Sequence, residues 1–173
     1  MRISVAAIGS RPREGFDELT RMYLERAAAL LPGGSGKAGA RAGSRSASSV
    51  RSAIEAPLFR TEEALWEAVD RERARTSPLV VLLDEHGKQM NSEAFAAWLG
   101  RELDGGRQWL VLAVGPADGW AKQRSASGNP RSQAMRLSLG PMTLPHELAR
   151  LLICEQLYRA LTILKGHPYH RGG

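Results

Sequence analysis

The chain has 173 residues, one cysteine and a formal net charge of +6. This length favours a single domain with one buried core, and the lone cysteine excludes an internal disulfide. The positive charge attracts polyanions, although charge alone does not separate nucleic acid from anionic lipid as a partner. The apolar run at the N-terminus is too short for a signal peptide or a membrane span, so we expect a cytoplasmic protein.

The N-terminal part is predicted to hold two strands and two helices. A buried strand is expected at residues 3–8, and apolar residues at helical spacing predict a helix at 14–31. Residues 32–50 are almost all Gly, Ala, Ser or basic, which is typical of a flexible solvated insertion, with contact to RNA phosphate as the alternative. We expect a strand near residues 53–59, followed by a helix that Thr61 caps.

Two continuous apolar runs, residues 79–84 and 109–114, are typical of central parallel strands that are covered on both faces. The turn Glu85-His86-Gly87-Lys88 is expected to end the first run. Further along, the pattern predicts helices at 92–103 and about 145–164, and a short apolar strand at 137–139. This alternation of strands and helices predicts an α/β fold with a mostly parallel sheet.

The loops that follow three of these strands are expected to line one crevice, because ligands in open α/β sheets bind at the carboxyl ends of the strands. These loops begin after Leu83, Val114 and Leu139. The second loop contains Gly115, which has no Cβ and so lets the backbone approach a ligand closely. Taken alone, its Gly-Pro-Ala-Asp-Gly sequence is more often an ordinary strand-to-helix turn.

Four histidines raise the question of a metal site, but no two are spaced four residues apart on a helix and no cysteine cluster accompanies them, so no metal is expected. Cys154 lies in an apolar helical pattern and is expected to be a buried thiol. Glu155 and Arg159 have the spacing of an ion pair within one helix. Residues 165–171 combine cations, imidazoles and a tyrosine, which suits contact with RNA, with a frayed basic terminus as the alternative.

Three uncommon segments follow one another in the C-terminal part of the chain. They are LSLGPMTLPHELAR at 137–150, EQLYRA at 155–160 and HPYHR at 167–171. Together with LDEHGK at 83–88, they resemble the ribosomal RNA large-subunit methyltransferase H family, which belongs to the SPOUT class. The similarity covers residues 79–171. Residues 32–50 depart from the family, as does Pro116, where many members have a second glycine and where proline removes an amide donor.

The resemblance implies a single SPOUT domain over residues 1–173, with a mostly parallel sheet flanked by helices and a C-terminal trefoil knot. It implies S-adenosyl-L-methionine (SAM) as the cofactor and 23S ribosomal RNA, within the large subunit or the 70S ribosome, as the substrate. The implied reaction is methylation of N3 of a pseudouridine in helix 69. A homodimer is implied as well, with no metal and no membrane.

The resemblance also carries site residues over, position by position. The residues implied to contact SAM are Leu83, Gly115, Leu139, Gly140, Pro141, Met142, Thr143 and Leu144. The implied catalytic residues are His170, Glu155 and Arg159, with His170 or Glu155 handling the proton, and the implied RNA contacts are Tyr169, Arg171 and His146. The alternatives are a SPOUT methyltransferase for another RNA nucleotide, or a non-catalytic protein that binds RNA or assists ribosome assembly.

Overall fold

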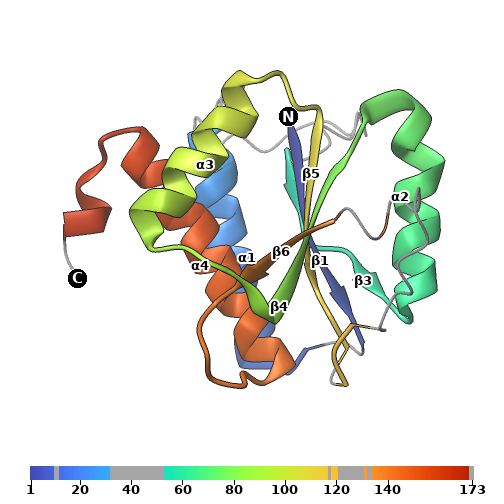
Figure 1. Ribbon diagram of the computed structural model, residues 1–173. Helices are drawn as coiled ribbons and strands as arrows, with labels where there is room; N and C mark the ends of the chain where they lie inside the picture. The colour runs from blue at the N-terminus through green and yellow to red at the C-terminus, as the bar shows by residue number, and fades with distance from the viewer. Residues whose placement is uncertain (10–11, 32–52, 117, 121–130, 132–133, 172–173) are drawn as a thin grey trace, which may run out of the picture.

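The computed structural model describes residues 1–9, 12–31, 53–116, 118–120, 131 and 134–171 (Figure 1). The basic insertion predicted at residues 32–50 lies outside the described residues. The side chains of His170 and Arg171 lie outside them as well, although the backbone there is described.

Within the described part of the chain, six strands form one sheet in which every pair of neighbours is parallel. The strand order is β2-β1-β5-β4-β6, and β3 also pairs with β1. The strands are β1 (Arg2–Ile8), β2 (Ile54–Glu55), β3 (Leu58–Phe59), β4 (Leu79–Gln89), β5 (Trp109–Val114) and β6 (Met135–Ser138). The predicted α/β fold with a mostly parallel sheet is confirmed.

Helices cover both faces of this sheet, as Figure 1 shows. Three of them pack on one face and α2 packs alone on the other. The helices are α1 (Glu14–Leu30), α2 (Glu62–Thr76), α3 (Ser92–Asp104) and α4 (His146–Leu164), with a short 3-10 helix, η1 (Pro168–Arg171), after α4. None of the described helices is long and apolar enough to cross a membrane. The trefoil knot stays a prediction of the resemblance.

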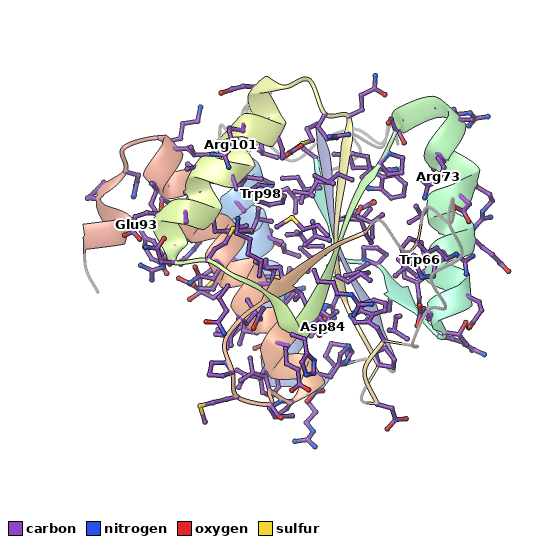
Figure 2. All side chains as sticks on the ribbon, in the orientation of Figure 1. Trp66, Arg73, Asp84, Glu93, Trp98 and Arg101 are labelled. Atoms are coloured by element: carbon purple, nitrogen blue, oxygen red, sulfur yellow. The ribbon has the colours of Figure 1, made fainter. Side chains whose placement is uncertain are left out.

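The continuous apolar strands are explained by these two covered faces. In β5, Leu110 and Leu112 pack in the cluster beneath α1, α3 and α4, whereas Val111 and Ala113 pack in the cluster beneath α2. Figure 2 shows the same division for two labelled tryptophans, Trp98 of α3 and Trp66 of α2, which lie on opposite sides of the sheet. Burying each such aliphatic side chain contributes about 1.5–3 kcal/mol.

The predicted helix cap is confirmed. Thr61 has extended backbone and its Oγ1 accepts a hydrogen bond from the Ala64 amide at 3.2 Å, which satisfies one of the free donors in the first turn of α2. The strand predicted at residues 53–59 is instead divided into β2 and β3. Pro57 lies between them and has no N–H to give to the sheet, although its carbonyl accepts from the Ala7 amide at 3.1 Å.

The prediction that β4 ends at the turn Glu85-His86-Gly87-Lys88 is wrong. Both Leu83 and Lys88 pair with Leu137 of β6, so the residues between them bulge out and the strand then resumes. A Cβ on Gly87 would lie 2.6 Å from the Leu137 backbone nitrogen. The glycine therefore lets the two backbones meet, and the bulge projects Asp84 beyond the carboxyl end of the first half of β4.

Candidate functional site

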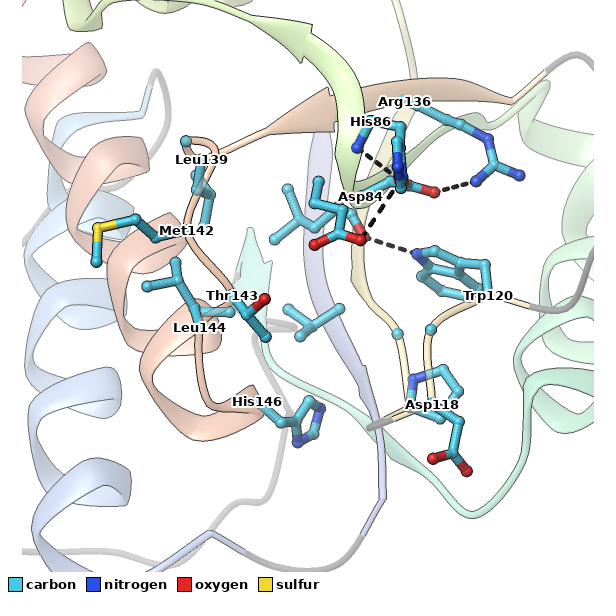
Figure 3. A pocket seen from close by; sticks show the side chains of 18 residues that line it. Asp84, His86, Asp118, Trp120, Arg136, Leu139, Met142, Thr143, Leu144 and His146 are labelled. Atoms are coloured by element: carbon cyan, nitrogen blue, oxygen red, sulfur yellow. Dashed lines mark hydrogen bonds and ion pairs between the residues drawn. The ribbon is translucent and has the colours of Figure 1, made fainter.

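A cavity of about 530 Å³ lies at the β4 bulge, where the first half of β4 ends, and at the carboxyl ends of β5 and β6. It is lined by Leu83 from β4, Val114 from β5 and Leu139 from the segment after β6. The prediction that the loops after these three strands line one crevice is therefore confirmed. Figure 3 shows the labelled side chains around this cavity.

The cavity brings together most of the residues that the resemblance assigned to SAM. Seven of the eight line it: Leu83, Gly115, Leu139, Gly140, Met142, Thr143 and Leu144. Pro141, the eighth, is not among the lining residues, and Met142 is largely exposed at 77%. Asp84, Arg136 and Trp120 also line the cavity, although neither the sequence pattern nor the resemblance assigned them a role in the site.

The segment between β6 and α4 forms one wall of the cavity. Ser138 Oγ donates to the Gly140 carbonyl at 3.0 Å and accepts from the Gly140 amide at 3.1 Å, which fixes the turn at the end of β6. Gly140 has a φ angle of +139°, a backbone conformation that residues with a side chain rarely adopt. The chain then runs to α4 without helix or strand. Its backbone groups are consequently not committed to a ladder and can serve a ligand beside the apolar side chains.

Trp120 joins the ends of β4 and β5. Its indole Nε1–H donates to the Leu83 carbonyl at 2.7 Å, and a Cβ added to Gly115 would lie 2.9 Å from Trp120 Cε2. The requirement for glycine at position 115 therefore has a cause that the sequence did not reveal. The missing Cβ makes room for the indole ring, in addition to any role toward a ligand.

A charged group closes the side of the cavity at the β4 bulge. The Asp84 carboxylate accepts from the His86 amide at 2.9 Å and forms an ion pair with Arg136 of β6. Burial alone would raise the pKa of Asp84, but the hydrogen bonds from the His86 amide and from Arg136 outweigh it and hold the pKa below its usual value. A negative charge therefore persists at this wall at neutral pH.

The N-terminal end of α4 lines the cavity on the side away from Asp84 (Figure 3). His146 lines the cavity, and its Nε2 is buried with no hydrogen-bond partner among the described residues. Burial first, and then the charge of Arg150, lower the pKa of His146, so its imidazole is neutral near pH 7. Arg150 is only 4% exposed and donates from Nη2 to the Ala56 carbonyl at 2.9 Å, whereas its Nε and Nη1 have no partner within the described residues.

Glu155, Arg159 and Tyr169 form a second group of functional candidates, here called the tail cluster. Glu155 Oε1 accepts from Arg159 Nε at 2.9 Å and from the Tyr169 hydroxyl at 3.3 Å, and Glu155 Oε2 accepts from the Gln156 side-chain Nε2 at 2.7 Å. The Arg159 guanidinium lies 5.1 Å from the centre of the Tyr169 ring. The sequence spacing predicted the ion pair, which is confirmed, but not its contact with the tyrosine.

The contacts of the tail cluster fix its ionisation. The hydrogen bond to Glu155 raises the pKa of Arg159, which leaves the guanidinium charged. Burial, and after it the hydroxyl of Tyr23, raise the pKa of Tyr169 to about 12, so the phenol keeps its proton. Cys154, next to this cluster on α4, is fully buried, and burial raises the pKa of its thiol to about 12. The prediction of a buried thiol is confirmed.

The cavity lies at the N-terminal end of α4, whereas the tail cluster extends from the middle of α4 to η1. Glu155 follows His146 by nine residues, which is about 14 Å along a helix. None of the three tail-cluster residues lines the cavity. His170 and Arg171 belong to η1, which follows the cluster. Across the described ranges, no three His, Cys, Asp or Glu side chains are grouped so that they could hold a metal ion.

A family model described as "Predicted SPOUT methyltransferase" matches residues 1–170. The chain is 41% identical over 172 residues to the ribosomal RNA large subunit methyltransferase H of Koribacter versatilis, and 42% identical over 172 residues to that of Rhizobium meliloti, with 99% of each chain covered. Among solved structures, the chain is similar to a ribosomal RNA small subunit methyltransferase E from Neisseria gonorrhoeae bound to S-adenosyl methionine. The TM-score is 0.45 and the sequence identity is 14%, and the match covers 95% of this chain and 66% of that chain. The family model and the full-length relatives place the protein in one family: it belongs to the SPOUT methyltransferases.

Proposed function

We propose that the protein transfers a methyl group from SAM to N3 of a pseudouridine in helix 69 of 23S ribosomal RNA. The observation that carries this proposal is the meeting of Leu83, Gly115 and the segment from Leu139 to Leu144 around one cavity. The full-length relatives named as large-subunit methyltransferases support the choice of ribosomal RNA.

The cavity fits the size and chemistry of SAM. Its volume of about 530 Å³ lies within the usual range for small-molecule sites, which combine apolar walls with a few polar groups. Leu83, Leu139 and Leu144 are suited to enclose the adenine ring, and the backbone of the segment after β6 is suited to its polar edge. Asp84 and Arg136, paired with each other, add polar groups to one wall of the cavity. When bound, SAM supplies a methyl group that carries electrophilic character from the adjacent sulfonium.

The residues of this chain must then orient the base and remove its N3 proton. Arg159 is charged and held by Glu155, so we assign it to the RNA, where it would bind phosphate or stabilise the deprotonated imide. Both Glu155 oxygens already accept hydrogen bonds, which makes this carboxylate a support for Arg159 rather than a proton acceptor. We therefore assign the proton to His170, with Tyr169 and Arg171 contacting RNA.

His146 takes a different role in this proposal from the RNA contact that the sequence implied. It lies inside the cavity, with a neutral ring and a buried Nε2. These properties suit contact with the bound cofactor better than contact with a phosphate on the surface.

The separation of the cavity from the tail cluster supports a homodimer. Glu155, Arg159 and Tyr169 do not line the cavity of their own chain. In a homodimer, the tail of one subunit can reach the cavity of the other and complete the site. We therefore propose a composite site with residues from two chains.

Methylation of ribosomes tests the proposal. Purified protein and SAM are incubated with 70S particles or free 23S ribosomal RNA from a strain that lacks the corresponding enzyme, and the product is mapped by mass spectrometry. We expect one methyl group on the helix 69 pseudouridine. Methylation of another nucleotide would support a different SPOUT specificity. Absence of SAM binding in calorimetry would support a non-catalytic RNA-binding protein.

A further inference from the structure

We propose that Trp120 is a positioning residue for the cofactor, which holds the ends of β4 and β5 together at the floor of the cavity. This inference rests on the proposed function, because it takes SAM as the ligand. The resemblance assigned no role to Trp120, whereas it did assign Leu83 and Gly115, the two residues that Trp120 contacts.

The contacts of the indole are the first reason. Its N–H donates to the Leu83 carbonyl at 2.7 Å, across 37 positions of sequence, and the space over Gly115 is filled by its ring, where a Cβ would lie 2.9 Å from Cε2. A carbonyl oxygen has two lone pairs, so the hydrogen bond from the indole does not by itself exclude a ligand from the Leu83 carbonyl. The indole therefore fixes the direction of this carbonyl without using all of its capacity.

The position of the ring between core and cavity is the second reason. Trp120 packs against the buried cluster beneath α2 and at the same time lines the cavity. In Figure 3 it lies across the cavity from Leu139 and Leu144. A nucleoside held by those leucines would thus have the indole as its opposite wall.

The other three tryptophans provide a comparison. Trp66, Trp98 and Trp109 are buried and are not among the lining residues. Trp109 is closely matched to Trp120, because its Nε1–H donates to Ser4 Oγ at 2.8 Å. It lies at the N-terminal end of β5, away from the cavity. Trp109→Phe therefore removes an equivalent indole hydrogen bond without touching the proposed site.

The test compares Trp120→Phe with Trp109→Phe by calorimetric titration with SAM and by thermal melting. Loss of one hydrogen bond that orients the site predicts SAM binding about five- to ten-fold weaker in Trp120→Phe. In Trp109→Phe we expect wild-type affinity together with an equal or larger loss of melting temperature. Methylation at saturating SAM should recover in Trp120→Phe, because a positioning role acts on cofactor binding. Unchanged or tighter binding of SAM by Trp120→Phe overturns the inference.

Fluorescence gives a second measurement, whose wild-type result does not depend on how a variant folds. SAM added to the wild type and to Trp109→Phe should change tryptophan emission, and this change should be absent in Trp120→Phe. A wild type that binds SAM with no change in emission contradicts contact with the indole and leaves the proposed function standing. A wild type that binds no SAM contradicts the proposed function itself and the inference with it.

Discussion

The cavity at the N-terminal end of α4 and the tail cluster farther along the helix are built from different parts of the chain. At the N-terminal end of α4, the cavity is built mainly from turns and strand ends, with Gly140 and Gly115 allowing the backbone to bend or pack closely. From the middle of α4 to η1, the tail cluster is built from side chains, in which Arg159 and Tyr169 both donate hydrogen bonds to Glu155 and the Arg159 guanidinium lies over the Tyr169 ring. Residues of one sequence motif are therefore separate in space, which agrees with the composite site proposed above.

The largest effect is expected for Gly87→Ala, which tests whether the β4 bulge holds the cavity together. Gly87→Ala places a Cβ 2.6 Å from the Leu137 nitrogen, and backbone cannot move aside cheaply. We expect the free energy of unfolding to fall by about 3 kcal/mol, together with loss of SAM binding, as measured by urea denaturation and calorimetry. Gly15→Ala is the control, because nothing lies within 4 Å of its Cβ. If Gly87→Ala is as stable as this control, the β4 bulge does not hold the cavity together.

The next prediction tests whether the tail cluster acts independently of the cavity. Glu155→Gln removes the charge that holds Arg159, so methylation of ribosomes should fall about ten-fold while SAM affinity is unchanged. Glu102→Gln is the matched control, since Glu102 forms an ion pair with Arg107 outside both regions. A parallel loss of SAM affinity in Glu155→Gln would show that the tail cluster and the cavity form one site.

A third prediction contrasts two arginines of the same helix. Arg150 is buried without a counter-charge among the described residues, whereas Arg159 has Glu155. Arg150→Met should leave the free energy of unfolding unchanged or raise it by about 1 kcal/mol, because it removes an unpaired buried charge. Arg159→Met should lower it slightly, because Glu155 loses its partner. A loss of more than about 1 kcal/mol in Arg150→Met would contradict the assignment of that charge as unpaired.

The smallest effect concerns pH. The pKa of Asp84 is lowered from 3.8 in the folded protein, so its stabilising contribution is present above that value and is lost as the pH falls through the lower, folded pKa. Because Arg136 is 41% exposed, solvent screening limits the contribution to less than about 1 kcal/mol. Unfolding in urea from neutral pH to about pH 3 should show wild type and Asp84→Asn converging in acid. A difference that grows in acid contradicts this ion pair.

Hydrophobic pattern was sufficient to predict the sheet and the place of the cavity. The runs at 79–84 and 109–114 are apolar because each strand is buried on both faces, and the carboxyl ends of such strands meet at one edge. Pattern could not predict that β4 resumes after Gly87. The second half of β4 forms because Lys88 and Gln89 pair with Leu137 and Ser138 of β6, which is about fifty residues away in sequence.

The hydrogen bond from Trp120 to Leu83 and the separation of the tail cluster from the cavity could not be predicted for a related reason. A tryptophan after a Gly-rich turn carries no local signal that its N–H will reach the Leu83 carbonyl. The Glu155–Arg159 pair was visible from its spacing, because four residues make one helical turn. Its distance from the cavity was not visible, since the sequence motif runs continuously through both.

The central claim is that the cavity holds SAM and the tail cluster does not. Calorimetric titration of SAM into the wild type, Leu144→Arg and Arg159→Ala tests it most directly. Leu144 lines the cavity, so an arginine there fills it and brings a positive charge against a cationic ligand. We predict that the wild type and Arg159→Ala bind SAM equally and that Leu144→Arg binds none. Binding that survives in Leu144→Arg, or that disappears in Arg159→Ala, would contradict the claim.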